Sequence, residues 1–290
     1  MPIDLNVALS ASVTEETLSW TTTDVLLYHL SLGAGSLPNE PELHLTYEKD
    51  LSVLPTFALV AGTGPSSGTH KPPQMVMPGI DIDLRKVLHA GQYVTVHRPL
   101  PSSGQAVSRR RVSAVVDKNK AALIELETTA TNDDGPLWTH VSQIWARGEG
   151  GCGSAGEAFK PRKAAEDELT KPDISEVLSA PTRVNQAALY RLNGDFNPLH
   201  IDPDFARNAG LDRPILHGLA TLGISALALT RRYGTGLSHI GASFSQPVFP
   251  GDGLDFEVSV TGASTFAFEA LTTPRNATVL AHGEAQFDFS

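Results

Sequence analysis

The chain has almost no cysteine and no excess of positive charge. Its single thiol among 290 residues, Cys152, cannot form a disulfide within the chain or build a cysteine metal site. Its 22 lysines and arginines are outnumbered by 32 aspartates and glutamates, which gives a formal net charge of −10. Since affinity for a polyanion comes mainly from cationic side chains that neutralise phosphates, this balance argues against a nucleic-acid partner.

Long apolar runs are also missing. No stretch of about 18 apolar residues occurs, so we expect neither a membrane span nor a membrane partner. The start, MPID, has no basic region followed by an apolar run, and the end, FDFS, is no peroxisomal tripeptide address. We therefore expect a cytoplasmic protein. Its 41% hydrophobic and 19% charged residues are typical of a globular chain with a large core.

A change in composition near the middle of the chain predicts two units. Residues 148–156 are rich in glycine, and residues 160–168 are highly charged without apolar periodicity, which is typical of a surface linker. We divide the chain into an N-terminal unit of residues 1–149, a linker of residues 150–172 and a C-terminal unit of residues 173–290.

Each unit shows a helix followed by four strands. Residues 217–232 are apolar on all sides, which predicts a long buried helix in the second unit, and residues 25–34 form the corresponding helix of the first. The predicted strands are 92–98, 109–117, 121–131 and 137–147 in the first unit, and 238–246, 254–261, 265–273 and 278–289 in the second. The repeated order predicts an α+β fold in which an antiparallel sheet wraps around a helix in each unit.

The most informative segment is YRLNGDFNPLHIDP, residues 190–203. Gly194 and the proline after Asn197 predict a bent turn, which lets Asp195, Asn197 and His200 lie close together. A carboxylate and an imidazole that share one water can exchange protons with it and with a substrate. Asn197 offers a donor and an acceptor, so it can orient a neighbour. The alternative is an ordinary surface loop, because these are all turn residues.

Gly218 is expected in the first turn of the long helix. Its backbone N–H there has no intrahelical acceptor and lies at the positive end of the helix dipole. A polarised carbonyl oxygen could bind at such a position, as in an oxyanion hole. The alternative is that His217 and Gly218 merely begin a core helix, with glycine allowing close packing.

Other motifs predict little chemistry. The sequence GTGPSSG at residues 62–68 fails as a dinucleotide loop, because Pro65 removes a backbone donor and no helix can follow. The histidines include no His-x-x-x-His pair, so we expect no metal site. Arg109, Arg110 and Arg111 lie on a predicted strand, where alternate side chains point to opposite faces, so they cannot form one phosphate-binding patch.

With these segments together, the sequence resembles the R-specific 2-enoyl-CoA hydratase family, also called hydratase 2 or MaoC-like dehydratases. The resemblance lies in residues 190–203, in PILHGL at 214–219 and in PVFPGD at 247–252. The first half resembles the two-unit members at residues 26–33, 54–57 and 91–93. It implies a double hot dog fold in which the second unit carries the catalytic residues and the first shapes the acyl pocket.

The resemblance also implies the chemistry. Asp195 and His200 would be the acid–base pair, Asn197 their positioning partner, Gly218 N–H the thioester oxyanion donor and Tyr190 a supporting residue. The reaction would be reversible hydration of a trans-2-enoyl-CoA to an (R)-3-hydroxyacyl-CoA. No metal or redox cofactor is expected, since coenzyme A is part of the substrate, and the protein would be a homodimer.

The sequence departs from the family pattern at two places, and alternative functions remain. Where many relatives read His-Gly-Glu-Gln, this chain has His89, Ala90, Gly91 and Gln92, so that carboxylate is absent. Ser243 stands where an arginine for a coenzyme A phosphate is expected. A hot dog thioesterase and a non-catalytic acyl-thioester binding or scaffold subunit are the alternative functions. The sequence leaves open acyl chain length, a coenzyme A or acyl carrier protein thioester, and which of the pair is the base.

Overall fold

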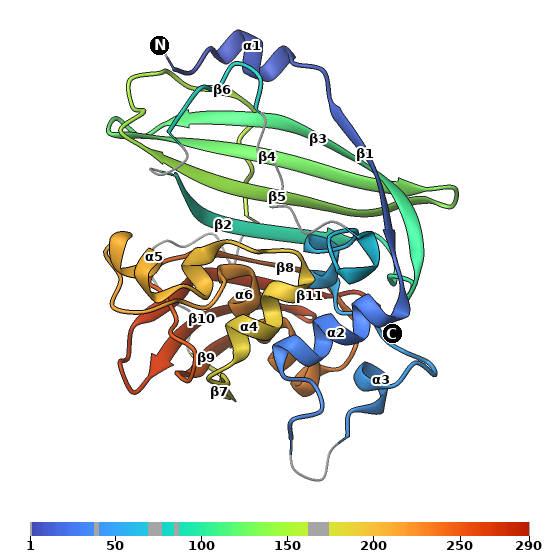
Figure 1. Cartoon of the computed structure of the whole chain (residues 1–290). Helices are drawn as coiled ribbons and strands as arrows, with labels where there is room; N and C mark the ends of the chain where they lie inside the picture. Colours follow the sequence, from blue (N-terminus) through green and yellow to red (C-terminus); the bar gives the residue numbers. More distant parts are fainter. Residues whose placement is uncertain (1, 38–40, 69–76, 84–86, 162–173, 290) are drawn as a thin grey trace.

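The structure is a computed structural model that describes residues 2–37, 41–68, 77–83, 87–161 and 174–289 (Figure 1). The strands are β1 (Thr14–Trp20), β2 (Val87–Val96), β3 (Gly104–Asp117), β4 (Ala121–Asn132), β5 (Gly135–Arg147), β6 (Ala155–Gly156), β7 (Glu176–Pro181), β8 (Leu237–Phe244), β9 (Gly253–Val260), β10 (Thr265–Thr273) and β11 (Thr278–Phe287). The α-helices are α1 (Leu5–Ser10), α2 (Thr22–Leu32), α3 (Leu43–Thr46), α4 (Gln186–Tyr190), α5 (Pro203–Asn208) and α6 (Gly218–Tyr233). Short 3₁₀ turns are η1 (Pro55–Leu59), η2 (Pro65–Ser67), η4 (Arg191–Asn193) and η5 (Pro198–His200).

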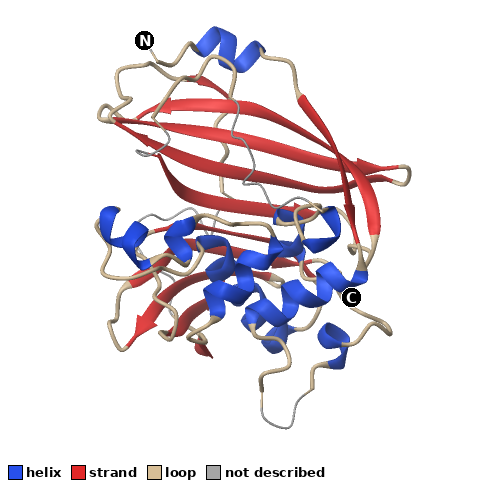
Figure 2. Ribbon diagram, in the orientation of Figure 1, coloured by secondary structure: helices blue, strands red, loops and turns tan. Residues whose placement is uncertain are grey.

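All the strands belong to a single antiparallel sheet. Its order is β1-β3-β4-β5-β2-β8-β11-β10-β9-β7, and β6 pairs with β3 (Figure 2). The two units meet where β2 pairs with β8, from Gly91 opposite Ser243 to Thr95 opposite His239. The predicted pair of sheets is therefore joined edge to edge, which removes one exposed edge from each unit. A sheet of this kind wrapped around two helices is the double hot dog architecture.

The helices end where their sequences provide caps. Thr21 and Asp24 form a capping box at the start of α2, and Gly33 ends the helix in the left-handed region with φ 107°. Helix α6 ends before Gly234, and its last turn carries two arginines that favour the negative end of the helix dipole. Both helices and all eight predicted strands are present, with boundaries shifted by a few residues.

Two edge strands were not predicted. Strand β1 is mostly exposed and buries only Trp20, and β7 alternates weakly, so neither shows a strong hydrophobic pattern. The predicted linker contains the short strand β6, which pairs with β3. Most of its charged part, from residue 162 onward, lies outside the described residues. Glycine-rich residues 62–68 form the turn η2 and its neighbours rather than a helix entry.

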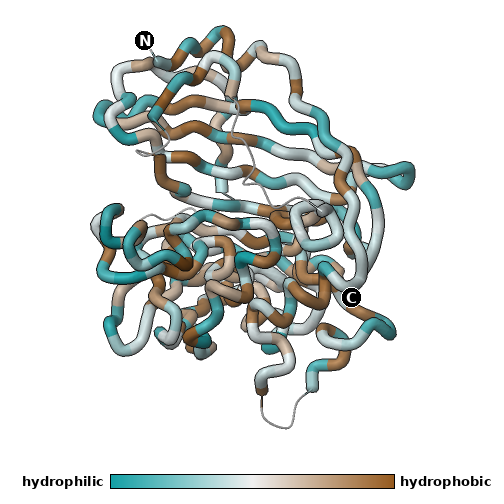
Figure 3. The backbone as a smooth tube through the Cα atoms, in the orientation of Figure 1, coloured by the Kyte–Doolittle hydropathy of each residue, from teal (hydrophilic) through white to brown (hydrophobic). Residues whose placement is uncertain are grey.

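One main core joins the two units. Helix α6 is buried along residues 220–230, and it packs with α2 against Val94 of β2 and Ile240 of β8. We call the sheet face that carries Val94 and Ile240 the inner face. A second, smaller apolar cluster lies at the far end of the first unit and includes α1, Met77 and Ile144. The hairpin between β4 and β5 projects beyond the sheet and is hydrophilic at its tip (Figure 3).

In the described part of the chain, no helix is long and apolar enough to cross a membrane.

Helix α6 lies close to α2 at Gly223. A Cβ atom there would lie 2.7 Å from a methyl group of Leu32 and 2.9 Å from the Tyr28 hydroxyl, both on α2. In a helix interior, Gly→Ala normally stabilises by about 1 kcal/mol. Here we expect Gly223→Ala to lower the melting temperature, because overpacking a core costs about 1–3 kcal/mol. Thermal unfolding checks the sign, and a raised melting temperature would contradict the contact.

Candidate active site

The predicted acid–base residues lie on a tight turn of the second unit that contacts the first unit. Helix α4 and the turn η4 lead to Gly194, which has φ 113° in the left-handed region. A Cβ atom at Gly194 would lie 2.4 Å from the Thr63 carbonyl oxygen, so only glycine fits. The Thr63 hydroxyl in turn donates to the Asn193 carbonyl oxygen at 2.7 Å. Thr63 of the first unit therefore fixes the backbone position directly before Asp195.

Short-range hydrogen bonds then fold Asp195 back toward His200. The Asn197 N–H donates to Asp195 Oδ1 at 3.1 Å, and the His200 N–H donates to the Asn197 carbonyl oxygen at 3.2 Å. The exposed Asn197 side chain accepts from the Leu199 N–H at 3.0 Å and so caps the turn η5. Asn197 thus shapes the turn through its backbone and its cap, and its role as the positioning partner of the acid–base pair stays a prediction.

His200 is buried with one ring nitrogen engaged. Its Nδ1 lies 2.9 Å from the Ile215 carbonyl oxygen, which fixes the tautomer with the proton on Nδ1. Its Nε2 is then an acceptor in the neutral ring. Burial lowers the pKa of His200 below its usual value of 6.5, although the charge of Asp195 opposes this shift. Near neutral pH the ring is uncharged and can accept a proton.

The sequence interpretation missed His217, which completes the cluster. Its ring stacks on that of His200 with centroids 3.7 Å apart, and its Nε2 lies 3.3 Å from the Asp195 carbonyl oxygen. Burial, then the neighbouring His200, lowers the pKa of His217 to about 3. Its Nδ1 has no hydrogen-bond partner among the described residues. The signal for His217 in the sequence is its position directly before Gly218. The start of a core helix also explains that position, so the signal does not distinguish a site residue from a packing residue.

Asp195, His200 and His217 could also hold a metal ion. One ligand atom from each lies within 4.8 Å of the others. A search for closely spaced histidines could not find this set, because Asp195 and His217 are 22 residues apart. A metal would take the same carboxylate and imidazole that acid–base chemistry uses. The expected lack of a metal stays a prediction.

Gly218 is the first residue of α6, as predicted, so its N–H has no acceptor within the helix. A Cβ atom there would lie 3.3 Å from the ring of Phe244, so the glycine permits close contact with the end of β8. The Phe244 ring in turn packs edge-on against His89 of β2, with centroids 4.9 Å apart. The start of the buried helix therefore lies beside a side chain of the first unit.

Tyr190 supports the cluster from behind. Its ring is buried, 4.9 Å from the ring of His217 and 6.1 Å from that of Tyr28. Its hydroxyl has no partner among the described residues. Burial raises the pKa of Tyr190 well above its usual value, so the phenol stays protonated. Tyr190 is a packing neighbour of His217 in this structure, while the predicted acid–base pair lies on the turn that follows.

The fold and the site define a double hot dog protein with an acid–base cluster in its second unit. Residues 18–148 match the MFE-2 hydratase 2 N-terminal domain, and residues 166–279 match the MaoC like domain. The chain is 45% identical to an enoyl-CoA hydratase of Mycobacterium tuberculosis, ChsH3, over 97% of each chain. It therefore belongs to the family of hydratase 2 and MaoC-like dehydratases.

Two further proteins show the same likeness. The chain is 32% identical to the peroxisomal enoyl-CoA hydratase 2 of Arabidopsis thaliana, over 95% of this chain and 93% of the relative. A crystal structure of a MaoC-like dehydratase from Phytophthora capsici superposes with a TM-score of 0.88 at 27% identity, covering 99% of each chain. Likeness over such lengths covers both units and the turn that carries Asp195.

The lowered pKa values of the two stacked histidines can be tested directly. At pH 6.5, where an unperturbed histidine is half protonated, we expect the His217 ring to stay neutral and the His200 ring to be less than half protonated. NMR titration of ring carbons, assigned with His200→Gln and His217→Gln, checks this. Half-protonation of either ring at pH 6.5 or above would show that burial does not control this site.

Proposed function

We propose that the chain is a hydro-lyase that reversibly hydrates trans-2-enoyl-CoA to (R)-3-hydroxyacyl-CoA. The observation that carries this function is the placement of Asp195 and His200, with ligand atoms within 4.8 Å, just ahead of the α6 N-terminus. The relatives named enoyl-CoA hydratase and 3-hydroxyacyl-thioester dehydratase support it. Such hydration belongs to fatty acid metabolism.

The pair of Asp195 and His200 activates water. A water held between the Asp195 carboxylate and His200 Nε2 adds its oxygen to C3 of the enoyl group, and a proton is delivered to C2 on the same face. One residue takes the proton from the water while the other supplies the proton to C2, which is general acid–base catalysis. Both groups have the chemistry to serve as the base, so that role is not assigned to one of them.

Gly218 stabilises the charge that develops on the thioester. As C3 is attacked, negative charge moves to the thioester oxygen. The Gly218 N–H lies at the positive end of the α6 dipole, where it can donate to that oxygen. Because the thioester itself delocalises the charge, the reaction needs no metal or redox cofactor.

The first unit shapes the acyl pocket. Its contribution is supported by two contacts at the site, Thr63 with Gly194 and His89 with Phe244. The boundaries expected from the sequence assign residues 1–149 to a non-catalytic unit, residues 150–172 to a linker and residues 173–290 to a catalytic unit.

We further propose that the protein is a homodimer in the cytoplasm. Its substrate would be a thioester of coenzyme A or of acyl carrier protein. Light scattering and cell fractionation test the dimer and the location.

Removing either member of the acid–base pair should abolish most activity. We expect Asp195→Asn and His200→Gln each to lower kcat for hydration by about 10²–10⁴-fold, because each variant loses a proton-transfer group. The loss of absorbance of the conjugated thioester measures the rate. Matched melting temperatures show that both variants are folded.

A thiol assay run beside this measurement separates hydration from hydrolysis. Hydration leaves the thioester intact, so wild-type protein should release no free coenzyme A. Near wild-type rates in either folded variant, or release of thiol in step with substrate loss, would contradict the assignment.

Metal ions should inhibit rather than support the reaction. We expect dialysis against a chelator to leave kcat unchanged, because the acid–base pair works through protons alone. Added Zn²⁺ should inhibit by occupying Asp195, His200 and His217, whose donor set suits it. His217→Gln should weaken that inhibition. Loss of activity on chelation that Zn²⁺ restores would instead make the cluster a metal centre.

A further inference from the structure

A row of polar side chains crosses the inner face of the first unit between its two apolar clusters. Register places Arg110 opposite Thr128, Thr128 opposite His140, and His140 opposite Val94. Directly paired residues of an antiparallel sheet share a face. Since Val94 is buried in the main core, the other three side chains lie on the inner face as well.

Hydrogen bonds extend this row toward the candidate active site. Gln92 is buried, and its amide nitrogen lies 3.3 Å from His140 Nδ1. Its amide oxygen accepts from the Ser142 hydroxyl at 2.8 Å and lies 3.1 Å from His89 Nε2. We call this set the polar row; its members are His89, Gln92, Ser142, His140, Thr128 and Arg110.

One end of the polar row lies at the catalytic cluster. The His89 ring packs against Phe244, which lies against Gly218. Burial lowers the pKa of His89, and the charge of Asp195 is among the effects that oppose this shift. The other end lies on β3, since β8, β2, β5, β4 and β3 are consecutive neighbours. Strands are spaced about 4.8 Å apart, so the row spans about 14 Å from β2 to β3, and Arg110 lies about 19 Å across the sheet from β8.

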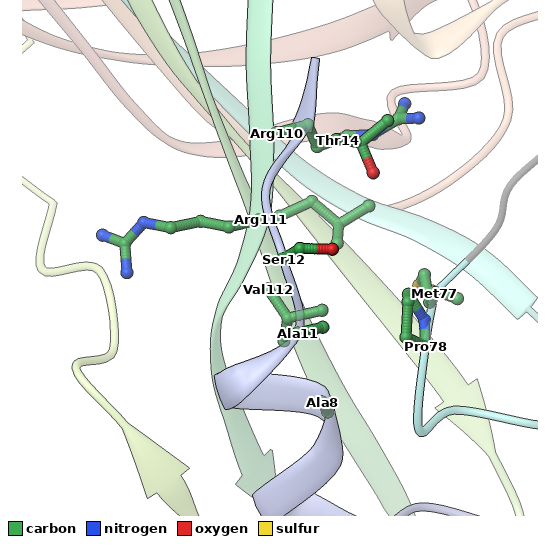
Figure 4. A pocket seen from close by; sticks show the side chains of 10 residues that line it. Ala8, Ala11, Ser12, Thr14, Met77, Pro78, Arg110, Arg111 and Val112 are labelled. Carbon is green, nitrogen blue, oxygen red and sulfur yellow. The ribbon is translucent and has the colours of Figure 1, made fainter.

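Arg110 differs from the arginines on either side of it. Arg109 pairs with Glu15 at 2.9 Å and Arg111 with Glu127 at 2.7 Å. Arg110 is half-buried, and no carboxylate of the described residues pairs with it. Figure 4 shows Arg110 and Arg111 pointing to opposite sides of β3, with Arg110 on the side of Met77. Arg110 and Met77 both line a small pocket.

The neighbouring His140 ring supplies no negative charge to pair with Arg110. Burial, followed by the positive charge of Arg110, lowers the pKa of His140 to about 4, so its ring is neutral at physiological pH. A guanidinium that a bound ligand withdraws from water needs acceptor oxygens, and a carboxylate satisfies it best through two parallel hydrogen bonds. The far end of the row therefore offers hydrogen-bond donors to an oxygen of a ligand.

We propose that the polar row selects acyl thioesters that carry an oxygen acceptor at the far end of the acyl group, and that Arg110 binds this oxygen. The inference rests on the proposed hydratase function and names its substrate class. A carboxylate and a ketone share the required chemistry. A purely aliphatic tail would leave the Arg110 guanidinium desolvated without a partner, which is unfavourable.

The test compares three long-chain trans-2-enoyl-CoA thioesters that end in a methyl group, a carboxylate or a ketone. Arg110→Met should raise KM for an oxygenated substrate by about 10–100-fold, the usual effect of losing a hydrogen bond to a charged group. Its kcat should change little, because the contact is equal in ground and transition states. The methyl-ended substrate should be unaffected.

Two matched variants serve as controls. Arg109→Met removes a neighbouring arginine that pairs with Glu15 on the opposite face and should leave all three KM values unchanged. Arg110→Lys keeps the charge and should restore part of the affinity for the carboxylate. Equal melting temperatures exclude a folding defect in any of them.

The outcomes distinguish a failure of this inference from a failure of the proposed hydratase function. An effect on the carboxylate substrate alone, or on the ketone alone, supports the inference and identifies the acceptor. Arg110→Met that changes all three substrates equally, or none, overturns it while leaving hydration in place. Wild-type protein that hydrates none of the three thioesters contradicts the proposed function itself.

Discussion

The pairing of β2 with β8 is the constraint on which the site depends. It converts two sheets into one and brings Val94 and Ile240 into the same core as α6. The pairing is close, since a Cβ atom at Gly241 would lie 2.0 Å from the ring of Tyr93. Through this junction His89 of the first unit reaches Phe244 and the start of α6. A weaker junction would separate the Gly218 donor from half of its surroundings.

The sequence predicts the repeated helix-and-strand units because their hydrophobic patterns are local. It does not predict that β2 and β8 pair, since backbone pairing between distant edges leaves no periodic mark. Strand β1 was not predicted, because it buries only Trp20 and so lacks a hydrophobic pattern. In the site, Asp195 and His200 share one short motif and were found. His217 was missed, because its stacking on His200 arises only when α6 is docked.

Withdrawal from water keeps the imidazoles near the site uncharged. Burial, followed by the neighbouring His200, lowers the pKa of His217 to about 3, and burial, followed by the charge of Arg110, lowers the pKa of His140 to about 4. Stacking His200 on a charged His217 would place two cations in contact, and the neutral ring avoids this repulsion. The same desolvation that costs stability therefore leaves His200 Nε2 able to take a proton.

Contacts around α6 and the turn before Asp195 tie the acid–base motif to the half of the chain that lacks it. Thr63 supports the turn before Asp195, and at the other end of the helix Arg231 pairs with Glu42 at 2.7 Å. Both partners come from the first unit. A fusion of the second unit to a foreign first unit would therefore have to rebuild both contacts, the Thr63 hydrogen bond and the Glu42 ion pair.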